Sequence, residues 1–426
     1  MEQLNFATPS ITPEDVANPY YRKSERMPLM DLFAGIASFS KAAEETGRFK
    51  TIMTSEIDSY CSKLIDQKYG YENAGCIESL GTPAEQHKDK TLTDDDIVPC
   101  EHTGLSSICL EDFYDGSMEF PFVITGGFPC TEVTLANSTA EGVNGGQSEL
   151  VDEQLRIIRA LEPQYCIFEN SNQLVNRGLD QILTELKDIG YIVEWETISA
   201  ATYGYPHYRH RCYVVAYLPS SKAATSGTRI FDLVRANAPE SPDWKLPLNT
   251  AENAEAVLNS AVAHAPREFK LRTKRINALG NTVILDIVRA IFNAILSIQD
   301  GKSLSPQGDL VKYAESTTDS WDAKGPKSKL GYITFPPSGY MKNGIAMAPA
   351  LPCRKLNPTK TQFTNMFSTL IKKDGNNNFT CKSRTSRPGK LGGLIGDIMK
   401  LGADHGGLHP EFAEVFMGYE KGHTAL

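Results

Sequence analysis

The sequence lacks the features that mark secreted and membrane-spanning proteins. Its first 28 residues contain no apolar core of signal-peptide length, and no uninterrupted apolar stretch approaches the ~18 residues that a membrane span requires. Its nine cysteines are odd in number and form no CxxC pair, which argues against a disulfide framework and a structural zinc site. The sequence therefore predicts a cytoplasmic protein with reduced thiols and no bound metal.

The chain also lacks an excess of positive charge. It carries 43 basic against 52 acidic residues, and an acidic total argues against nucleic-acid binding, because nucleic-acid-binding domains are usually basic. The charge is unevenly distributed, however. Residues 1–300 hold 26 basic and 42 acidic residues, whereas residues 301–426 hold 17 and 10. This asymmetry indicates an acidic body with a basic module at 351–400 that fits a polyanion, although solvated loops with ordinary lysines would give the same count.

Length and periodicity predict an α/β protein of two or three domains. Strands are predicted at 27–33, 50–57, 120–127, 164–170, 192–200 and 211–218. Helical spacing of apolar residues occurs at 39–49, 58–70, 148–163, 178–189 and 276–298. This alternation of strands and helices favours a parallel sheet covered by helices.

Three stretches depart from this pattern. Residues 71–119 are acidic and poorly periodic, which predicts an insertion or long loops. Residues 301–330 are rich in Ser, Lys, Gly and Pro and are predicted to be a linker. Residues 331–405 combine many glycines with short apolar runs, which suggests a small, irregular β structure.

The first chemical motif is a turn of small residues after the first predicted strand. It runs from Asp31 to Phe39 and includes Gly35, and the next strand ends in Glu56. Such a turn lets the backbone approach a ligand, and an acid in that place can bind both hydroxyls of a ribose. Because the sequence has no G-x-G-x-x-G phosphate motif, an adenosyl cofactor without phosphates is favoured over a dinucleotide. An ordinary α/β crossover remains the alternative.

Three further motifs lie at predicted strand ends. Cys130 follows Gly126-Gly127-Phe128-Pro129 and is placed like a nucleophile, although a lone cysteine is more often structural. Glu169 ends a strand and could act as a general acid, or simply be a surface acid. Arg209 and Arg211 alternate at the start of a strand, which would put both on one face and suit an anionic centre or an edge-strand charge pair. The conjunction of these motifs at one sheet edge is more specific than any member.

Taken together, these motifs resemble those of DNA (cytosine-5)-methyltransferases of phage and bacteria, including those of restriction-modification systems. The matching segments are 31–35, 126–130, 145–150, 168–170, 207–211, 279–283, 408–412 and 417–419. The departures from the family pattern are Ala37-Ser38 for Gly-Gly, Thr131 for Gln, Gln147 for Arg, Ser171 for Val, His207 for Gln, and no Gly-Asp-Ile near Ser107-Ile108.

The resemblance implies a Rossmann-like S-adenosylmethionine-dependent methyltransferase domain over residues 1–300. A smaller, irregular β-rich and basic target recognition domain would span 301–405, and residues 406–426 would pack back on one of the two. This places the recognition region after the Gly-Asn motif, since residues 218–270 are neither basic nor rich in strands.

The implied reaction is transfer of a methyl group from S-adenosyl-L-methionine to C5 of a flipped-out cytosine in double-stranded DNA, through a covalent Cys130–C6 adduct. Glu169 would hold the base, and Arg209 and Arg211 would steady the adduct and the nearby backbone. The implied cofactor-binding residues are Phe33, Ala34, Gly35, Ile36, Glu56, Ile57, Pro129, Leu150 and Asn281. The DNA-binding residues are predicted to be Arg354, Lys355, Lys382, Arg384, Arg387 and Lys390. The chain is expected to be monomeric.

Three other interpretations remain. A tRNA cytosine-5 methyltransferase has a similar sequence, but the long C-terminal module argues against it. A catalytically inactive, sequence-specific DNA-binding homologue would not need Cys130, Glu169 and Arg211. A nucleotide oxidoreductase is disfavoured by the missing phosphate loop. The recognised DNA sequence cannot be read from these motifs.

Overall fold

A computed structural model gives the fold of the protein. It describes residues 26–80, 113, 116, 118–129, 149–240, 262–263, 271–304, 310–316, 321–323, 333–349, 356, 366–375, 393–400 and 407–426. Cys130, segment 145–148, most of the 71–119 insertion and the six predicted DNA-binding residues lie outside this part of the chain.

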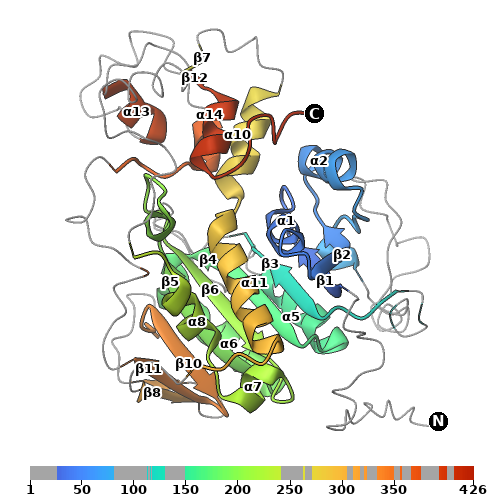
Figure 1. The fold of residues 1–426 in the computed structure, drawn as a ribbon, viewed down its shortest axis with the longest axis vertical. Coiled ribbons are helices and arrows are strands. Elements are labelled where there is room, and N and C mark those ends of the chain that lie inside the picture. The colour runs from blue at the N-terminus through green and yellow to red at the C-terminus, as the bar shows by residue number, and fades with distance from the viewer. Residues whose placement is uncertain are drawn as a thin grey trace.

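A ten-stranded sheet runs through the molecule in the order β2-β1-β3-β4-β6-β5-β10-β11-β8-β9 (Figure 1). Its parallel part consists of β1 (Met27–Leu32), β2 (Phe49–Ser55), β3 (Val123–Gly126) and β4 (Tyr165–Ser171). β6 (Arg211–Tyr217) is antiparallel to both β4 and β5 (Ile192–Ile198). The predicted α/β fold class is confirmed, with a parallel sheet as far as β4.

Helices cover both faces of the sheet. The helices of the described residues are α1 (Ser38–Glu44), α2 (Ser59–Tyr69), α5 (Glu149–Leu161), α6 (Leu179–Asp188), α7 (Lys222–Ser226), α8 (Ile230–Asn237), α10 (Arg272–Asn281), α11 (Leu285–Gln299), α13 (Gly393–Lys400) and α14 (Pro410–Phe416). Of these, α10, α13 and α14 lie above the sheet in Figure 1 rather than on its faces. Shorter elements are η2 (Ile77–Ser79), η5 (Asn172–Asn176), η6 (Ala200–Tyr203), η8 (Lys372–Gly375) and the pair β7 (Val262–Ala263) and β12 (Gly407–Leu408).

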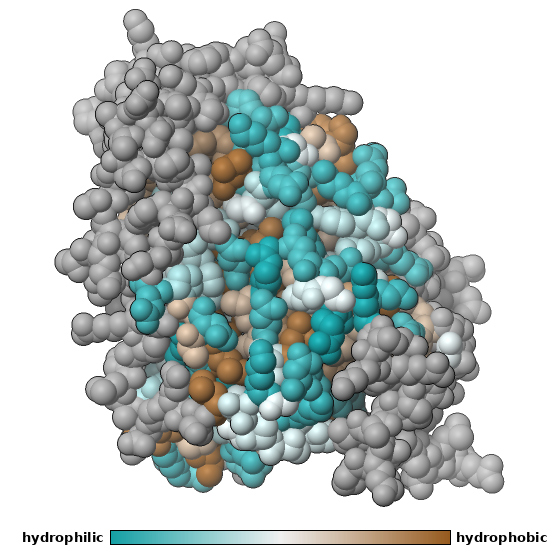
Figure 2. Space-filling view, viewed as in Figure 1, coloured by the Kyte–Doolittle hydropathy of each residue, from teal (hydrophilic) through white to brown (hydrophobic). Residues whose placement is uncertain are grey.

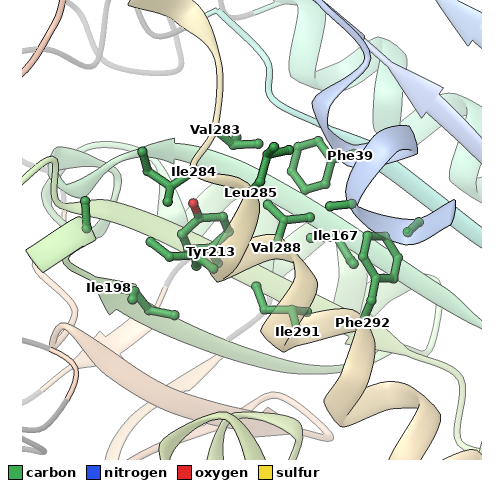
Figure 3. Close-up of a cluster of buried hydrophobic side chains, with 14 of the residues drawn as sticks. Phe39, Ile167, Ile198, Tyr213, Val283, Ile284, Leu285, Val288, Ile291 and Phe292 are labelled. Atoms are coloured by element: carbon green, nitrogen blue, oxygen red, sulfur yellow. The ribbon is translucent and has the colours of Figure 1, made fainter. Parts of the chain in front are cut away.

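Two apolar layers hold these helices on the sheet. The alternation of β4 sends Ile167 into one cluster with α1, α8 and α11, while Cys166 and Phe168 enter a second cluster with α5 and α6. Figure 3 shows Phe292 of α11 close to Ile167, with Phe39 of α1 above them. The described surface in Figure 2 is mainly hydrophilic, with apolar side chains in small, separate groups. The strongly apolar faces therefore point inward, as amphipathic spacing predicts.

Two helical predictions need correction. The helix predicted at 276–298 is two helices, because the chain leaves helical geometry at Thr282, after α10. Residues 272–299 are long and apolar enough to cross a membrane by length and composition, but 67% of the most apolar window is buried inside the protein. Conversely, α7 and α8 form at residues 222–237, where the spacing of apolar residues predicts no helix. Buried Glu194 of β5 accepts hydrogen bonds from the first two amides of α8, Ile230 N (3.0 Å) and Phe231 N (3.1 Å), a cap that no local pattern records.

The linker predicted at 301–330 is wrong in part. β8 (Leu310–Ser316) and β9 (Trp321–Ala323) form there, and they join β10 (Ser338–Lys342) and β11 (Ile345–Pro349) in extending the sheet. β10 pairs with β5, where a Cβ on Gly339 would lie 2.1 Å from the Trp195 ring. The first strands of the predicted recognition region are thus continuous with the sheet that contains β1 to β6. β8 pairs with β9 and β10 pairs with β11, but β10 also pairs with β5, more than 100 residues earlier in the chain, and a local pattern does not record that pairing.

Candidate active site

The turn after β1 has an unusual backbone. Phe33 (φ 53°), Gly35 (φ 57°) and Ala37 (φ 59°) all adopt left-handed geometry, which is uncommon for residues other than glycine. Ala34 N donates to Ser55 O at 3.0 Å, which ties the turn to the end of β2. Residues 33–37, here called the cofactor turn, therefore form a constrained loop of the kind found at binding sites.

Glu56 lies directly against the cofactor turn. Its carboxylate accepts hydrogen bonds from Gly35 N (2.6 Å) and Asp58 N (2.7 Å), while Asn73 bonds both backbone groups of Glu56. Burial raises the pKa of Glu56 to about 7. Because a carboxyl group accepts about four hydrogen bonds, capacity remains for a ribose hydroxyl.

These residues fit an adenosyl cofactor. The neighbouring Ile57 side chain is 49% exposed, which offers an apolar surface to a purine ring. A Cβ placed on Gly35 would meet no atom within 4 Å, so the turn opens onto free space. Ala34 and Ile36 of the turn are buried, and Phe33 and Leu150 pack against the apolar cluster under α5 and α6. Pro129 and Asn281 are exposed.

A buried acid below the turn orients these elements. Asp31 accepts hydrogen bonds from Ser40 N (3.1 Å) and Ser40 Oγ (2.8 Å) of α1, and from Thr125 Oγ1 (2.8 Å) of β3. Burial raises its pKa to about 6, against the effect of these hydrogen bonds. Asp31 therefore joins β1, β3 and the first turn of α1 around the cofactor turn.

The loop that leads to Cys130 is packed against the end of β4. A Cβ on Gly126 would lie 2.5 Å from Gln154 Oε1, and one on Gly127 would lie 3.2 Å from Glu169 Oε2. Asn170 Nδ2 donates to Phe128 O at 3.1 Å. A side chain at either glycine would therefore press on the Gln154 or Glu169 side chain, and the described chain stops one residue before Cys130, beside Glu169.

Glu169 and Arg211 form an ion pair across β4 and β6. Arg211 Nε lies 3.1 Å from Glu169 Oε1, and Glu169 is only 7% exposed. Burial raises the pKa of Glu169, while the charges of Arg211 and Arg209 oppose that rise. A buried carboxyl group with a raised pKa beside a guanidinium retains its proton to higher pH than an exposed glutamate does.

Arg209 has a different environment from Arg211. It precedes β6 with φ 32°, so strand alternation does not relate the two side chains as the sequence suggested. Its buried guanidinium donates to the carbonyls of Leu370 (2.8 Å), Gly280 (3.0 Å) and Thr282 (2.5 Å). Arg209 therefore joins the turn between α10 and α11 to the chain around residue 370.

This junction explains the glycine of the Gly-Asn motif. A Cβ on Gly280 would lie 2.4 Å from Lys372 N, and one on Gly375 would lie 2.8 Å from Thr273 O. Arg272 donates to Gly375 O at 3.1 Å. The backbones of α10 and η8 are therefore in direct contact. We call residues 366–375 the recognition segment and residues 280–284 the Gly-Asn turn.

His207 and the C-terminal residues complete this side of the site. His207 is buried, stacks on Phe416 at 4.5 Å between ring centroids, and has its Nε2 3.2 Å from Phe416 O. Burial lowers its pKa to about 3, so the neutral ring donates this hydrogen bond. Glu414 of α14 accepts from Arg275 of α10 at 2.7 Å. The C-terminal segment is thus packed on α10. The sequence motifs did not predict these particular contacts.

Comparisons with known proteins place the sequence among cytosine methylases. The model of the family described as C-5 cytosine-specific DNA methylase matches residues 27–286. The type II methyltransferase M1.ScrFI of Lactococcus lactis subsp. cremoris is 26% identical over 200 residues, covering 46% of this chain and 43% of that protein. M.DsaV of Dactylococcopsis salina is 25% identical over 199 residues, covering 46% and 47%. The chain therefore aligns with less than half the length of each. The S. pombe Dnmt2 methyltransferase structure matches with a TM-score of 0.32 and 17% identity over 46% of this chain and 50% of that one.

Proposed function

Because the chain belongs to the C-5 cytosine-specific DNA methylase family, we propose that it methylates C5 of a flipped-out cytosine in a specific sequence of double-stranded DNA. The observation that supports this most directly is the buried Glu169–Arg211 pair beside the loop that enters Cys130. We also propose that the enzyme acts as a monomer in the cytoplasm. S-adenosylmethionine is the proposed cofactor, held by the cofactor turn, Glu56 and Ile57.

C5 of cytosine is a poor nucleophile. The enzyme must therefore supply a nucleophile of its own that adds to C6 and activates C5. The Cys130 thiolate forms a bond to C6, and the electrons of the C5–C6 double bond shift to C5 and N3. S-adenosylmethionine supplies an electrophilic methyl group when bound. A base then removes the C5 proton, the C5–C6 double bond re-forms, the Cys130–C6 bond breaks with return of the thiolate, and N3 returns its proton to the Glu169 carboxylate.

Glu169 and Arg211 serve the charge that develops on the base. In its protonated form Glu169 donates to N3 as the thiolate attacks, and its raised pKa keeps that form available at higher pH than for an exposed glutamate. Arg211 orients the Glu169 carboxyl group through the 3.1 Å contact at Oε1. Arg209 acts on the surrounding backbone rather than on the base.

The recognition region is proposed to lie at 301–405, with its DNA-binding part after the strands that extend the sheet. Deleting 301–405 would remove β8 to β11 together with the recognition segment, so substitutions are the better test of this assignment. Lys372 and Lys373 are suitable because both are exposed on η8, and neither forms an ion pair within the described residues. The η8 backbone packs directly on Gly280, and this contact places both lysines near the Gly-Asn turn.

Replacing Lys372 and Lys373 together by glutamine is expected to weaken binding to all duplex sequences alike, because phosphate contacts carry no sequence information. The slope of log Kd against log salt should fall by about 2, roughly one per lost phosphate contact. Binding of S-adenosylhomocysteine should be unchanged. The control pair, Lys302→Gln with Lys342→Gln, removes exposed lysines that follow α11 and end β10, and Figure 1 shows β10 well below α10. Equal salt slopes for the two double variants would contradict this role.

The activity itself is tested by bisulfite sequencing of DNA from cells that express the chain. The expected result is protection of cytosines within one short sequence context. If the purified protein binds DNA but cytosines are converted to the same extent in cells with and without it, the proposed reaction would be contradicted. Transfer of label to tRNA but not to duplex DNA would identify the tRNA enzyme instead.

A further inference from the structure

Three buried hydroxyl groups from distant parts of the chain meet behind the cofactor turn. Tyr419, just after α14, has its OH 2.7 Å from Ser38 Oγ and 2.6 Å from Thr282 Oγ1. Ser38 Oγ and Thr282 Oγ1 also hydrogen-bond each other. All three residues are buried. We call them the hydroxyl cluster.

The hydrogen bonds of the cluster can all be satisfied internally. Each hydroxyl has one proton to donate and can accept two hydrogen bonds, so a ring of three lets every group donate once and accept once. Burial raises the pKa of Tyr419 to about 12, which keeps its proton in place at neutral pH. Tyr419 OH also lies 3.3 Å from Val283 O, so removing one hydroxyl deprives the remaining buried hydroxyls of a partner within the cluster, which is costly.

The hydroxyl cluster joins two parts of the proposed site. Ser38 immediately follows Ala37 of the cofactor turn, and the next residue, Phe39, faces Val283 and Leu285 in Figure 3. On the other side, the carbonyl of Thr282 accepts from Arg209 at 2.5 Å, and the same guanidinium donates to Leu370 O. A continuous series of hydrogen bonds thus connects the recognition segment to the cofactor turn.

Ser38 distinguishes this connection from what the family motif alone would provide. It stands where the family resemblance has a glycine, which has no hydroxyl to offer. A contact of this kind therefore cannot be carried over from the motif and comes from the structure itself.

We propose that the hydroxyl cluster couples DNA binding to cofactor binding, with Ser38, Thr282 and Tyr419 as positioning residues. DNA held by the recognition segment fixes Arg209 and the Gly-Asn turn, and the fixed turn holds Ser38 and the cofactor turn in their binding geometry. The second ligand then has less ordering to impose, so each ligand strengthens the other. This inference rests on the proposed function, since it assumes both ligands.

The test measures the Kd of a duplex DNA containing the methylated sequence, with and without S-adenosylhomocysteine. For the wild type, S-adenosylhomocysteine should lower the DNA Kd by roughly 5-fold or more. In Tyr419→Phe, Thr282→Val and Ser38→Gly, this ratio should fall toward 1, while Thr282→Ser should keep it because the hydroxyl remains. Ser297→Ala, on α11 and outside the cluster, should also keep the wild-type ratio.

The possible results separate the inference from the proposed function. A wild type that binds both ligands with a ratio of 1, or hydroxyl-free variants with the wild-type ratio, would overturn the coupling and leave the methyltransferase proposal intact. A folded wild type that binds neither ligand would overturn the proposed function itself. Thermal unfolding of each variant shows whether a loss reflects unfolding, and rescue by Thr282→Ser separates lost coupling from lost structure.

Discussion

Replacing Cys130 by alanine is expected to abolish methyl transfer while leaving both DNA and cofactor binding close to wild type. Glu169 and Arg211, which lie beside the loop that leads to Cys130, offer no nucleophile of comparable strength that could replace the thiolate. Loss of a nucleophile that acts with its neighbours as a unit lowers turnover by roughly 10^4-fold or more. Tritium transfer from labelled cofactor to duplex DNA measures this loss.

The covalent step gives this prediction a second readout. DNA with 5-fluorocytosine at the target position blocks the loss of the C5 substituent, so the Cys130–C6 bond cannot break once the methyl group is added. The wild type should form an adduct that survives denaturing electrophoresis, and Cys130→Ala should form none. Cys166→Ala is the matched control, because Cys166 is buried in β4 and should leave the adduct unchanged. An adduct in Cys130→Ala would assign the nucleophile to another residue.

The second large effect is expected from Glu169→Gln, which keeps the shape of the side chain but cannot release or hold a proton. Turnover should fall by about 10^2- to 10^4-fold, the usual range for loss of a general acid. Burial raises the pKa of Glu169, so the protonated form declines only as the pH rises through that raised value. The wild-type rate should decrease over that range, and Glu169→Gln should lose this pH dependence.

A neighbouring acid provides the control for Glu169. Glu194 is equally buried on β5, but it binds Tyr217 OH and the first amides of α8 rather than the proposed site. Glu194→Gln should lower stability without changing the pH dependence of the remaining activity. A wild-type pH profile in Glu169→Gln, or the same loss of profile in Glu194→Gln, would contradict the assignment of the acid.

Local sequence patterns predicted much of the architecture around the site. The strands at 27–33 and 50–57 and the helix after Asp58 were recognisable because periodicity, small-residue turns and caps act over a few residues. Asp58 accepts from Tyr60 N and Cys61 N, and Gly70 ends the same helix with φ 65°. The resemblance to DNA (cytosine-5)-methyltransferases, made from the order of such motifs, is confirmed by the family match over residues 27–286.

The sequence by itself thus determined the fold class and the family, and it predicted that the turn at 33–37 and Glu56 lie together, since each depends on residues close together in the chain. Only the tertiary structure decided the separate environments of Arg209 and Arg211, the extension of the sheet by β8 to β11, and the hydroxyl cluster. Ser38 and Tyr419 are 381 positions apart and Arg209 and Leu370 are 161 apart, so no local pattern records their contact. Those contacts follow from how buried polar groups find partners once the apolar layers have packed.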